Sequence, residues 1–231
     1  MNYIDKILGD SVYKNEIIKL FYLFPVSQGD ISRYTDTQLE QVAKVLISII
    51  KETSIEDIVD IIEASKKNIA DITSANIPQF SNIELINDVL DVVNSTDNIS
   101  FEEIGYYLNK SASKGAQTKF GENHYKTAAL IGLTTQEKPF SITYLGKQYM
   151  ILDTDTKENV RNKLFLRVPI VQTIVIDAKY KKTIPMDILK EYLSESTSIR
   201  RRSNVRTMVD YICKSADVEF QMEIQKNLDW K

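Results

Sequence analysis

The chain has 231 residues, of which 43% are hydrophobic and 26% are charged, which is typical of a globular protein with one large domain or two small ones. One cysteine excludes an intrachain disulfide, and a single histidine makes His124 the only histidine that a metal site or a catalytic triad could use. The sequence begins without a signal-peptide pattern and holds no apolar run as long as a membrane helix. We therefore expect a cytoplasmic protein that makes no membrane contact.

Charge is unevenly divided along the chain. Residues 1–100 hold 8 Lys and Arg against 16 Asp and Glu, whereas residues 101–231 hold 21 against 16. The formal net charge of the whole chain is -3. Such an asymmetry indicates that the second part meets a polyanion, while the acidic part serves as a scaffold or contacts a protein.

The first third predicts an acidic helical domain, residues 1–80. Apolar residues recur at helical spacing in 13–24 and in 37–52. A further helix is predicted at 54–72, where Ser54 is the expected N-cap. Because these helices show dense apolar faces and no cluster of reactive side chains, we assign no activity to them.

Residues 81–152 show the element order of a winged-helix module. Helices are expected at 82–95, at 100–110 and around 122–133, with a polar turn before the last. The segment 138–152 is rich in Ile, Tyr and Phe around a glycine and predicts a pair of strands. Helix, short helix, turn, helix and hairpin is the winged-helix order.

Residues 153–231 predict a second, looser winged-helix-like module. The apolar segment 168–181 fits either a helix or a buried strand, because its periodicity does not decide between them. Pro185 stands near the start of the next helix, an amphipathic helix follows at 198–212, and 218–225 predicts a terminal strand. The predicted fold class is mainly α with small β-hairpins, as tandem winged-helix modules on an N-terminal helical domain.

Two of these helices predict polar faces that suit duplex DNA. In 116–132 the small residues pack on one side, and asparagine, lysine and threonine, which can meet base edges and phosphates, lie opposite. In 198–212 three arginines stand on the first turn, where the helix dipole disfavours cations and DNA phosphates would offset that cost. The predicted DNA-contacting residues are Lys114, Lys119, Asn123, His124, Lys126, Thr127, Lys147, Arg200, Arg201, Arg202, Ser203, Asn204, Arg206 and Thr207.

Short motifs in both modules resemble winged-helix DNA-recognition modules of type II restriction endonucleases, including type IIS enzymes. In the first module the motifs are "FEEIGYYLNK", "GENHYKTAALIGL" and "SITYLGKQYM", with 131–133 and 145–147 at the corresponding turns, and in the second the motif is "LSESTSIRRRSNVRTMVDYI". The resemblance covers about 81–215. It implies sequence-specific binding of double-stranded DNA without a cofactor, with a separate nuclease domain or subunit as a further partner.

Two other functions remain open from the sequence. One is a transcriptional regulator of the same winged-helix type. The other is a Mg²⁺-dependent nuclease, because "IVIDAKYKK" resembles the Asp-x-Lys half of a PD-(D/E)XK site, with Asp177 and Lys179 after an apolar segment and Asp155 as a second carboxylate. The Pro-Asp pair and the strand succession of that nuclease core are missing. Target recognition within a restriction-type system is the main prediction, with no catalysis by this chain alone.

Overall fold

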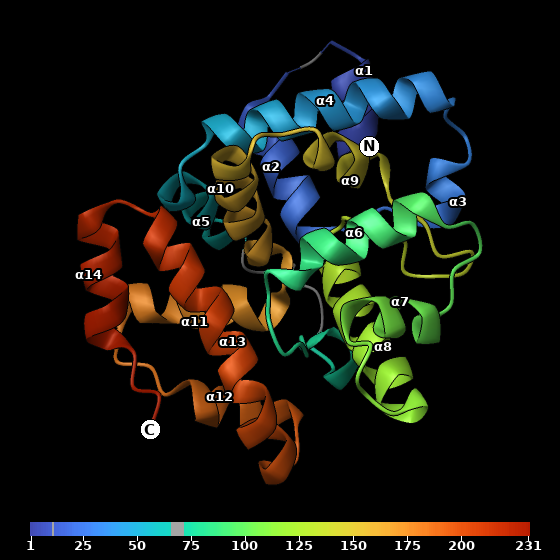
Figure 1. Cartoon of the computed structure of the whole chain (residues 1–231). Helices are drawn as coiled ribbons and strands as arrows, with labels where there is room; N and C mark the ends of the chain where they lie inside the picture. The colour runs from blue at the N-terminus through green and yellow to red at the C-terminus, as the bar shows by residue number, and fades with distance from the viewer. Residues whose placement is uncertain (11, 66–71) are drawn as a thin grey trace.

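The computed structural model describes residues 1–10, 12–65 and 72–231, and these fold almost entirely into helices (Figure 1). The α-helices are α1 (Tyr3–Leu8), α2 (Lys14–Leu23), α3 (Gln28–Ile31), α4 (Asp36–Glu52), α5 (Ile55–Glu63), α6 (Leu85–Ser95), α7 (Phe101–Leu108), α8 (Lys114–Leu130), α9 (Tyr144–Met150), α10 (Thr154–Leu164), α11 (Pro169–Tyr180), α12 (Pro185–Tyr192), α13 (Glu195–Ser215) and α14 (Val218–Asn227). The described residues also form two 3₁₀ helices, η2 (Ser74–Asn76) and η3 (Phe165–Arg167). The mainly α prediction is confirmed.

The strand pair predicted at 138–152 is wrong, because its second half forms the helix α9 (Tyr144–Met150). Thr143 caps that helix, and its side-chain oxygen accepts a hydrogen bond from the backbone N–H of Gly146. A Cβ atom on Gly146 would lie 2.1 Å from the carbonyl oxygen of Leu133, so the glycine permits a close approach of two backbones. Gly146, which the sequence pattern places between two strands, instead lies within α9 and allows this helix to pack closely on Leu133.

Within the described ranges, strand pairing is limited to two isolated bridges. Thr134 pairs with Ile142 in antiparallel fashion, which closes a loop between α8 and α9. Thr183 pairs with Leu228 in parallel fashion and ties the chain end to the start of α12. A hairpin of regular strands is therefore absent from the described part of the chain.

The terminal strand predicted at 218–225 is also wrong, since these residues lie in α14. The carboxylate of Asp217 caps this helix by accepting a hydrogen bond from the backbone N–H of Phe220. For 168–181, the helix is the correct one of the two alternatives, and Pro169 occupies its first turn.

The three arginines were predicted on the first turn of their helix. This is wrong, because α13 begins at Glu195. Arg200, Arg201 and Arg202 therefore occupy the second and third turns. The dipole of a helix acts mainly within its first turn, where the acidic side chain of Glu195 now lies. The expected local cost of these cations is accordingly small.

One hydrophobic cluster runs through all three predicted parts of the chain. It joins buried residues such as Ile50 of α4, Tyr149 of α9, Leu164 of α10 and Val209 of α13. The helix predicted at 54–72 is present as α5 but ends earlier, at Glu63, and residues 66–71 of the predicted range lie outside the described residues. Among the described helices, none is both long and apolar enough to cross a membrane.

Most of the predicted DNA-contacting residues lie on α8 and α13, each of which follows a shorter helix. We call α7 with α8 the first helix pair, and α12 with α13 the second helix pair. In the first pair, a Cβ atom on Gly105 would lie 1.7 Å from the carbonyl oxygen of Gln117, and one on Gly121 would lie 2.0 Å from that of Phe101. The two helices therefore cross in direct backbone contact. Figure 1 shows that α8 and α13 both begin at the lower side of the molecule in that view.

Candidate nucleic-acid interface

The outward faces of α8 and α13 carry most of the predicted DNA-contacting cations. On α8, Lys114, Lys119 and Lys126 are exposed. On α13, Arg200 and Arg206 are exposed. Ser203 is exposed between them, so α13 offers a serine between two guanidinium groups on its solvent face.

The lysines of α8 are all held by carboxylates. Lys114 lies 3.0 Å from Glu102 of α7. Glu122 accepts from Lys119 at 2.8 Å and from Lys126 at 2.6 Å, and these two ammonium groups lower the pKa of its carboxyl group. The positive charge of this helix is therefore largely neutralised within the first helix pair.

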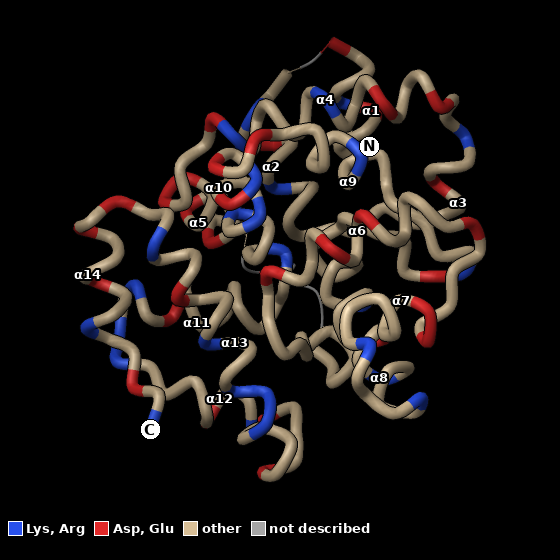
Figure 2. The backbone as a smooth tube through the Cα atoms, in the orientation of Figure 1, with Lys and Arg blue, Asp and Glu red and all other residues tan. Residues whose placement is uncertain are grey.

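The arginines of α13 have a different environment. Arg200 donates to the hydroxyl of Thr197 at 3.2 Å, and Arg202 donates to the carbonyl oxygen of Trp230 at 3.1 Å. Within the described part of the chain, neither of these arginines nor Arg201 forms an ion pair with a carboxylate, whereas Arg206 lies 3.5 Å from Asp210. Figure 2 shows basic residues gathered near the start of α13, and acidic residues over α6 and α7.

His124 was predicted to contact DNA, and the structure instead buries it with 1% exposure. Its Nδ1 donates to the carbonyl oxygen of Phe120 at 2.8 Å, which leaves Nε2 to accept from the backbone N–H of Ser81 at 3.3 Å. Burial lowers the pKa of the imidazole, so the neutral form is favoured. His124 therefore fastens α8 to residues 79–84, which we call the connecting segment.

Thr127 and Asn204 were also predicted to face DNA, and both are buried against the same connecting segment. The hydroxyl of Thr127 donates to the carbonyl oxygen of Gln79 at 3.1 Å. The side-chain amide of Asn204 donates to the carbonyl oxygen of Phe80 at 2.5 Å, and its side chain is covered from solvent. The outward orientation predicted for these residues is wrong, because a segment distant in sequence covers them.

The connecting segment ends at Glu84, which joins three parts of the chain. Its carboxylate accepts two hydrogen bonds from the guanidinium of Arg161 in α10, at 2.5 and 2.9 Å, and one from the hydroxyl of Tyr211 in α13, at 2.9 Å. Arg161 is only 2% exposed, and its hydrogen bonds hold the pKa of Glu84 below the usual range. Sequence reasoning missed this triad, because its members are 77 and 127 residues from Glu84 and share no local pattern.

The remaining predicted contacts are spread over several positions. Lys147 is exposed on α9, which packs against α4 at the upper side of Figure 1, away from the starts of α8 and α13. Asn123 is partly buried, and Thr207 is partly buried with its hydroxyl donating to the carbonyl oxygen of Ser203. Lys147 therefore does not share the surface that α8 and α13 form.

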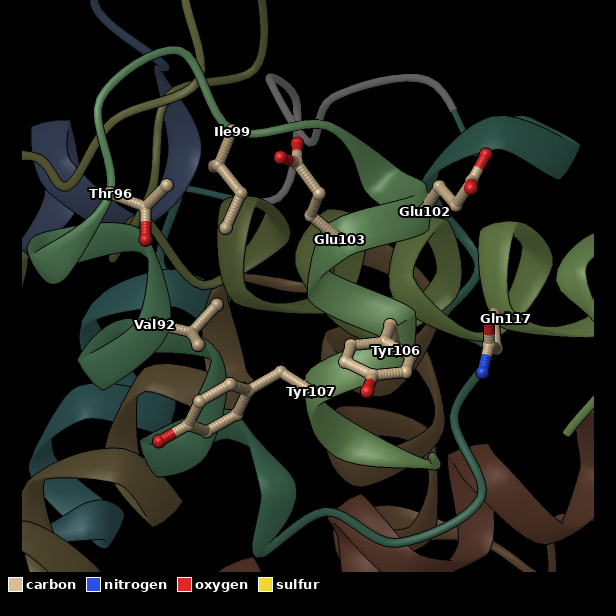
Figure 3. Close-up of a pocket in the computed structure, with 8 residues that line it drawn as sticks. All are labelled: Val92, Thr96, Ile99, Glu102, Glu103, Tyr106, Tyr107 and Gln117. Carbon is tan, nitrogen blue, oxygen red and sulfur yellow. The ribbon is translucent and has the colours of Figure 1, made fainter. Parts of the chain in front are cut away.

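A surface hollow lies between α6 and α7, as Figure 3 shows. Its volume is about 310 Å³, and Glu102, Glu103, Tyr106 and Tyr107 line it above an apolar floor. The two tyrosines are 55% and 58% exposed. Because two carboxylates border it, this hollow does not suit a polyanion, and we place the candidate interface on α8 and α13.

The predicted nuclease residues lie on helices and make other contacts. Asp177 and Lys179 belong to α11, where Lys181 lies 3.1 Å from Asp177 and Lys179 pairs with Asp60 of α5. Asp155 is exposed in the first turn of α10, and no contact between described residues joins it to Asp177. In the same part of the chain, no three residues of metal-binding type come together. The strand that the nuclease motif requires is replaced here by a helix.

No family model matches the chain, and no curated protein and no solved structure matches it significantly.

Proposed function

We propose that this protein binds duplex DNA in a sequence-specific way, as the target-recognition part of a restriction-type system. In this proposal the two helix pairs act as tandem winged-helix-like modules, with α8 and α13 as their recognition helices. The loop that the bridge between Thr134 and Ile142 closes is assigned the role of a small wing in this proposal. The acidic N-terminal helices serve as the scaffold.

The observation that carries the proposal is the group of three arginines on α13. Within the described residues, Arg200, Arg201 and Arg202 have no carboxylate partner, although the chain as a whole is acidic. Such guanidinium groups are suited to phosphate oxygens and to the O6 and N7 atoms of guanine. The resemblance of these segments to restriction-enzyme recognition modules supports the same function.

The proposal assigns base reading only to residues whose side chains reach solvent. Arg200, Ser203 and Arg206 on the solvent face of α13 are the proposed base-edge contacts of the second helix pair. Lys119 is the proposed base-edge contact of the first helix pair. His124, Thr127 and Asn204 are buried anchors in this scheme and do not touch DNA.

The experiment that tests this function is selection of bound sequences from random duplex DNA, followed by titration of the selected duplex at several salt concentrations. We expect one preferred sequence, and a linear fall of log affinity with log salt whose slope has a magnitude of at least about 4. A slope near zero, measured on protein that circular dichroism shows to be helical, would contradict DNA binding. A steep slope without a preferred sequence would reduce the function to non-specific binding.

A further inference from the structure

A small hollow lies where residues 74–79 face α8, and α13 contributes one residue to its lining. Its volume is about 100 Å³, which suits a few water molecules or one phosphate group but not a nucleoside. Lys119, Glu122, Asn123 and Lys126 line it from α8, and Arg201 lines it from α13. We call it the junction hollow.

Among the charged residues that line the junction hollow, Arg201 is the one without a hydrogen-bond or ion-pair partner in the described part of the chain. Its side chain is partly buried, and it makes no hydrogen bond or ion pair with any other residue that the structure describes. Loss of water around the guanidinium, together with the neighbouring Arg200, lowers its pKa. A cation that has lost part of its hydration without gaining a partner is stabilised when an anion binds beside it.

The balance of charge in the junction hollow is positive. Three cations border it, and Glu122 is its one carboxylate, which leaves a net charge of two positive units among the lining residues. Lys119 and Lys126 already pair with that carboxylate, so Arg201 is the cation that remains for a ligand. Asn123 adds a neutral amide, which makes no side-chain hydrogen bond within the described part of the chain and can donate to an oxyanion.

Of the elements that line the junction hollow, α8 and α13 are held in place by buried contacts. The connecting segment is bonded to α8 through Thr127 and His124, and to α13 through Asn204. Glu84 adds its bonds to Arg161 and Tyr211 at the end of the same segment. Because these contacts fix α8 relative to α13, the hollow exists before any ligand binds, and little ordering is needed on binding.

We propose that the junction hollow seats one backbone phosphate of the bound duplex, with the guanidinium of Arg201 as its main contact and the amide of Asn123 as a second donor. This inference rests on the proposed DNA-binding function and makes it more specific. The phosphate would lie between the two recognition helices, so that both helix pairs read one continuous stretch of DNA in a fixed register. Phosphate contacts position a protein on DNA in this way without reading sequence themselves.

The test uses the full chain, the selected duplex, and a set of duplexes in which one phosphate at a time is replaced by an uncharged methylphosphonate. For the wild-type protein, we expect one central replacement to lower affinity about tenfold. Arg201→Met should lower affinity for the unmodified duplex to a similar degree and reduce the salt slope by about 1. In that variant the same methylphosphonate should have almost no further effect, because the contact is already lost.

Arg200→Met is the matched control, because it removes the same charge from the adjacent, exposed position. This variant should remain fully sensitive to the central methylphosphonate. If Arg201→Met also remains sensitive at every position while the wild type binds the duplex, the inference is wrong and the DNA-binding function stands. If the wild type binds no duplex at all, both are wrong. Inorganic phosphate at millimolar concentration should compete only weakly, and strong competition with no effect of any methylphosphonate would assign the hollow to a free anion and overturn the inference.

Discussion

The two helix pairs differ in how their helices pack and in how their surface charges are paired. In the first, α7 and α8 meet through glycines whose missing side chains allow backbone contact, and each lysine on the outer face is paired with a glutamate. In the second, α13 presents Arg200, Arg201 and Arg202, which pair with no described carboxylate, whereas Arg206 pairs with Asp210. The distinguishing feature of the first pair is therefore close backbone packing, and that of the second is unpaired positive charge. If the proposed function holds, phosphate attraction therefore comes mainly from α13, while α8 is positioned by packing.

The largest expected effect tests the packing of the first helix pair. Gly121→Val should destabilise the protein by about 3 kcal/mol or more, because a Cβ atom there would lie 2.0 Å from the carbonyl oxygen of Phe101. Gly115→Ala on the same helix is the control, since no atom lies within 4 Å of its added Cβ. It should raise stability by up to about 1 kcal/mol. Urea unfolding measures both, and equal stability of the two variants would show that shape does not specify this pair.

The next effect tests whether Asn204 is an anchor or a base reader. Asn204→Ala should lower the free energy of unfolding by about 1–2 kcal/mol, because the buried carbonyl oxygen of Phe80 loses its donor. Sequence preference at each base pair should be unchanged. Ser203→Ala, next to it on the exposed face, should leave stability within about 0.5 kcal/mol. If Asn204→Ala lost sequence preference at one base pair and kept the wild-type free energy of unfolding, Asn204 would be a base-contacting residue and not a buried anchor.

A third change tests the neutralised charge of the first helix pair. Glu122→Gln releases Lys119 and Lys126 from their shared carboxylate, so duplex affinity should rise several-fold and the salt slope should steepen by about 1. Glu158→Gln removes an equivalent exposed charge that pairs with Lys214, and serves as the control. If both variants gain affinity equally, overall net charge would explain the effect, and the pairing on α8 would be irrelevant.

The smallest effect is a pH dependence that His124 contributes. Its pKa in the folded protein lies below the unfolded value of about 6.5, so the folded state binds this proton less readily. Its stabilising contribution is therefore complete above about pH 6.5 and falls as the pH decreases, by at most about 1.4 kcal/mol per pH unit. The free energies of unfolding of the wild type and of His124→Gln, compared between pH 7.5 and 5.5, measure this contribution. An identical pH dependence of the two proteins would show that the imidazole is not held neutral.

Sequence patterns were sufficient for features that depend on neighbouring residues. Helical spacing identified the stripe of Val205, Met208 and Val209, which is fully buried. The capping box of Ser100 and Glu103 is present with both of its hydrogen bonds. Such features depend on residues three or four positions apart, which a sequence shows directly.

Two kinds of error have clear physical causes. At 138–152 the β-propensity of Tyr, Phe and Ile predicts strands, but the cap at Thr143 and tertiary packing favour a helix. On α8 and α13, periodicity separated polar from apolar faces correctly, but it does not reveal which polar residues a distant segment covers. The connecting segment covers three of them, and its contacts span 43 to 124 residues of sequence.

The comparison of the two helix pairs is tested most directly by the salt dependence of duplex binding in two charge-matched variants. One is Arg200→Gln with Arg201→Gln on α13, and the other is Lys44→Gln with Lys51→Gln on α4, at the upper side of Figure 1. We predict that the arginine variant loses at least about tenfold in affinity and about 2 units of salt slope, whereas the α4 variant keeps the wild-type slope. An equal loss in both variants, or an unchanged slope in the arginine variant, would contradict the account.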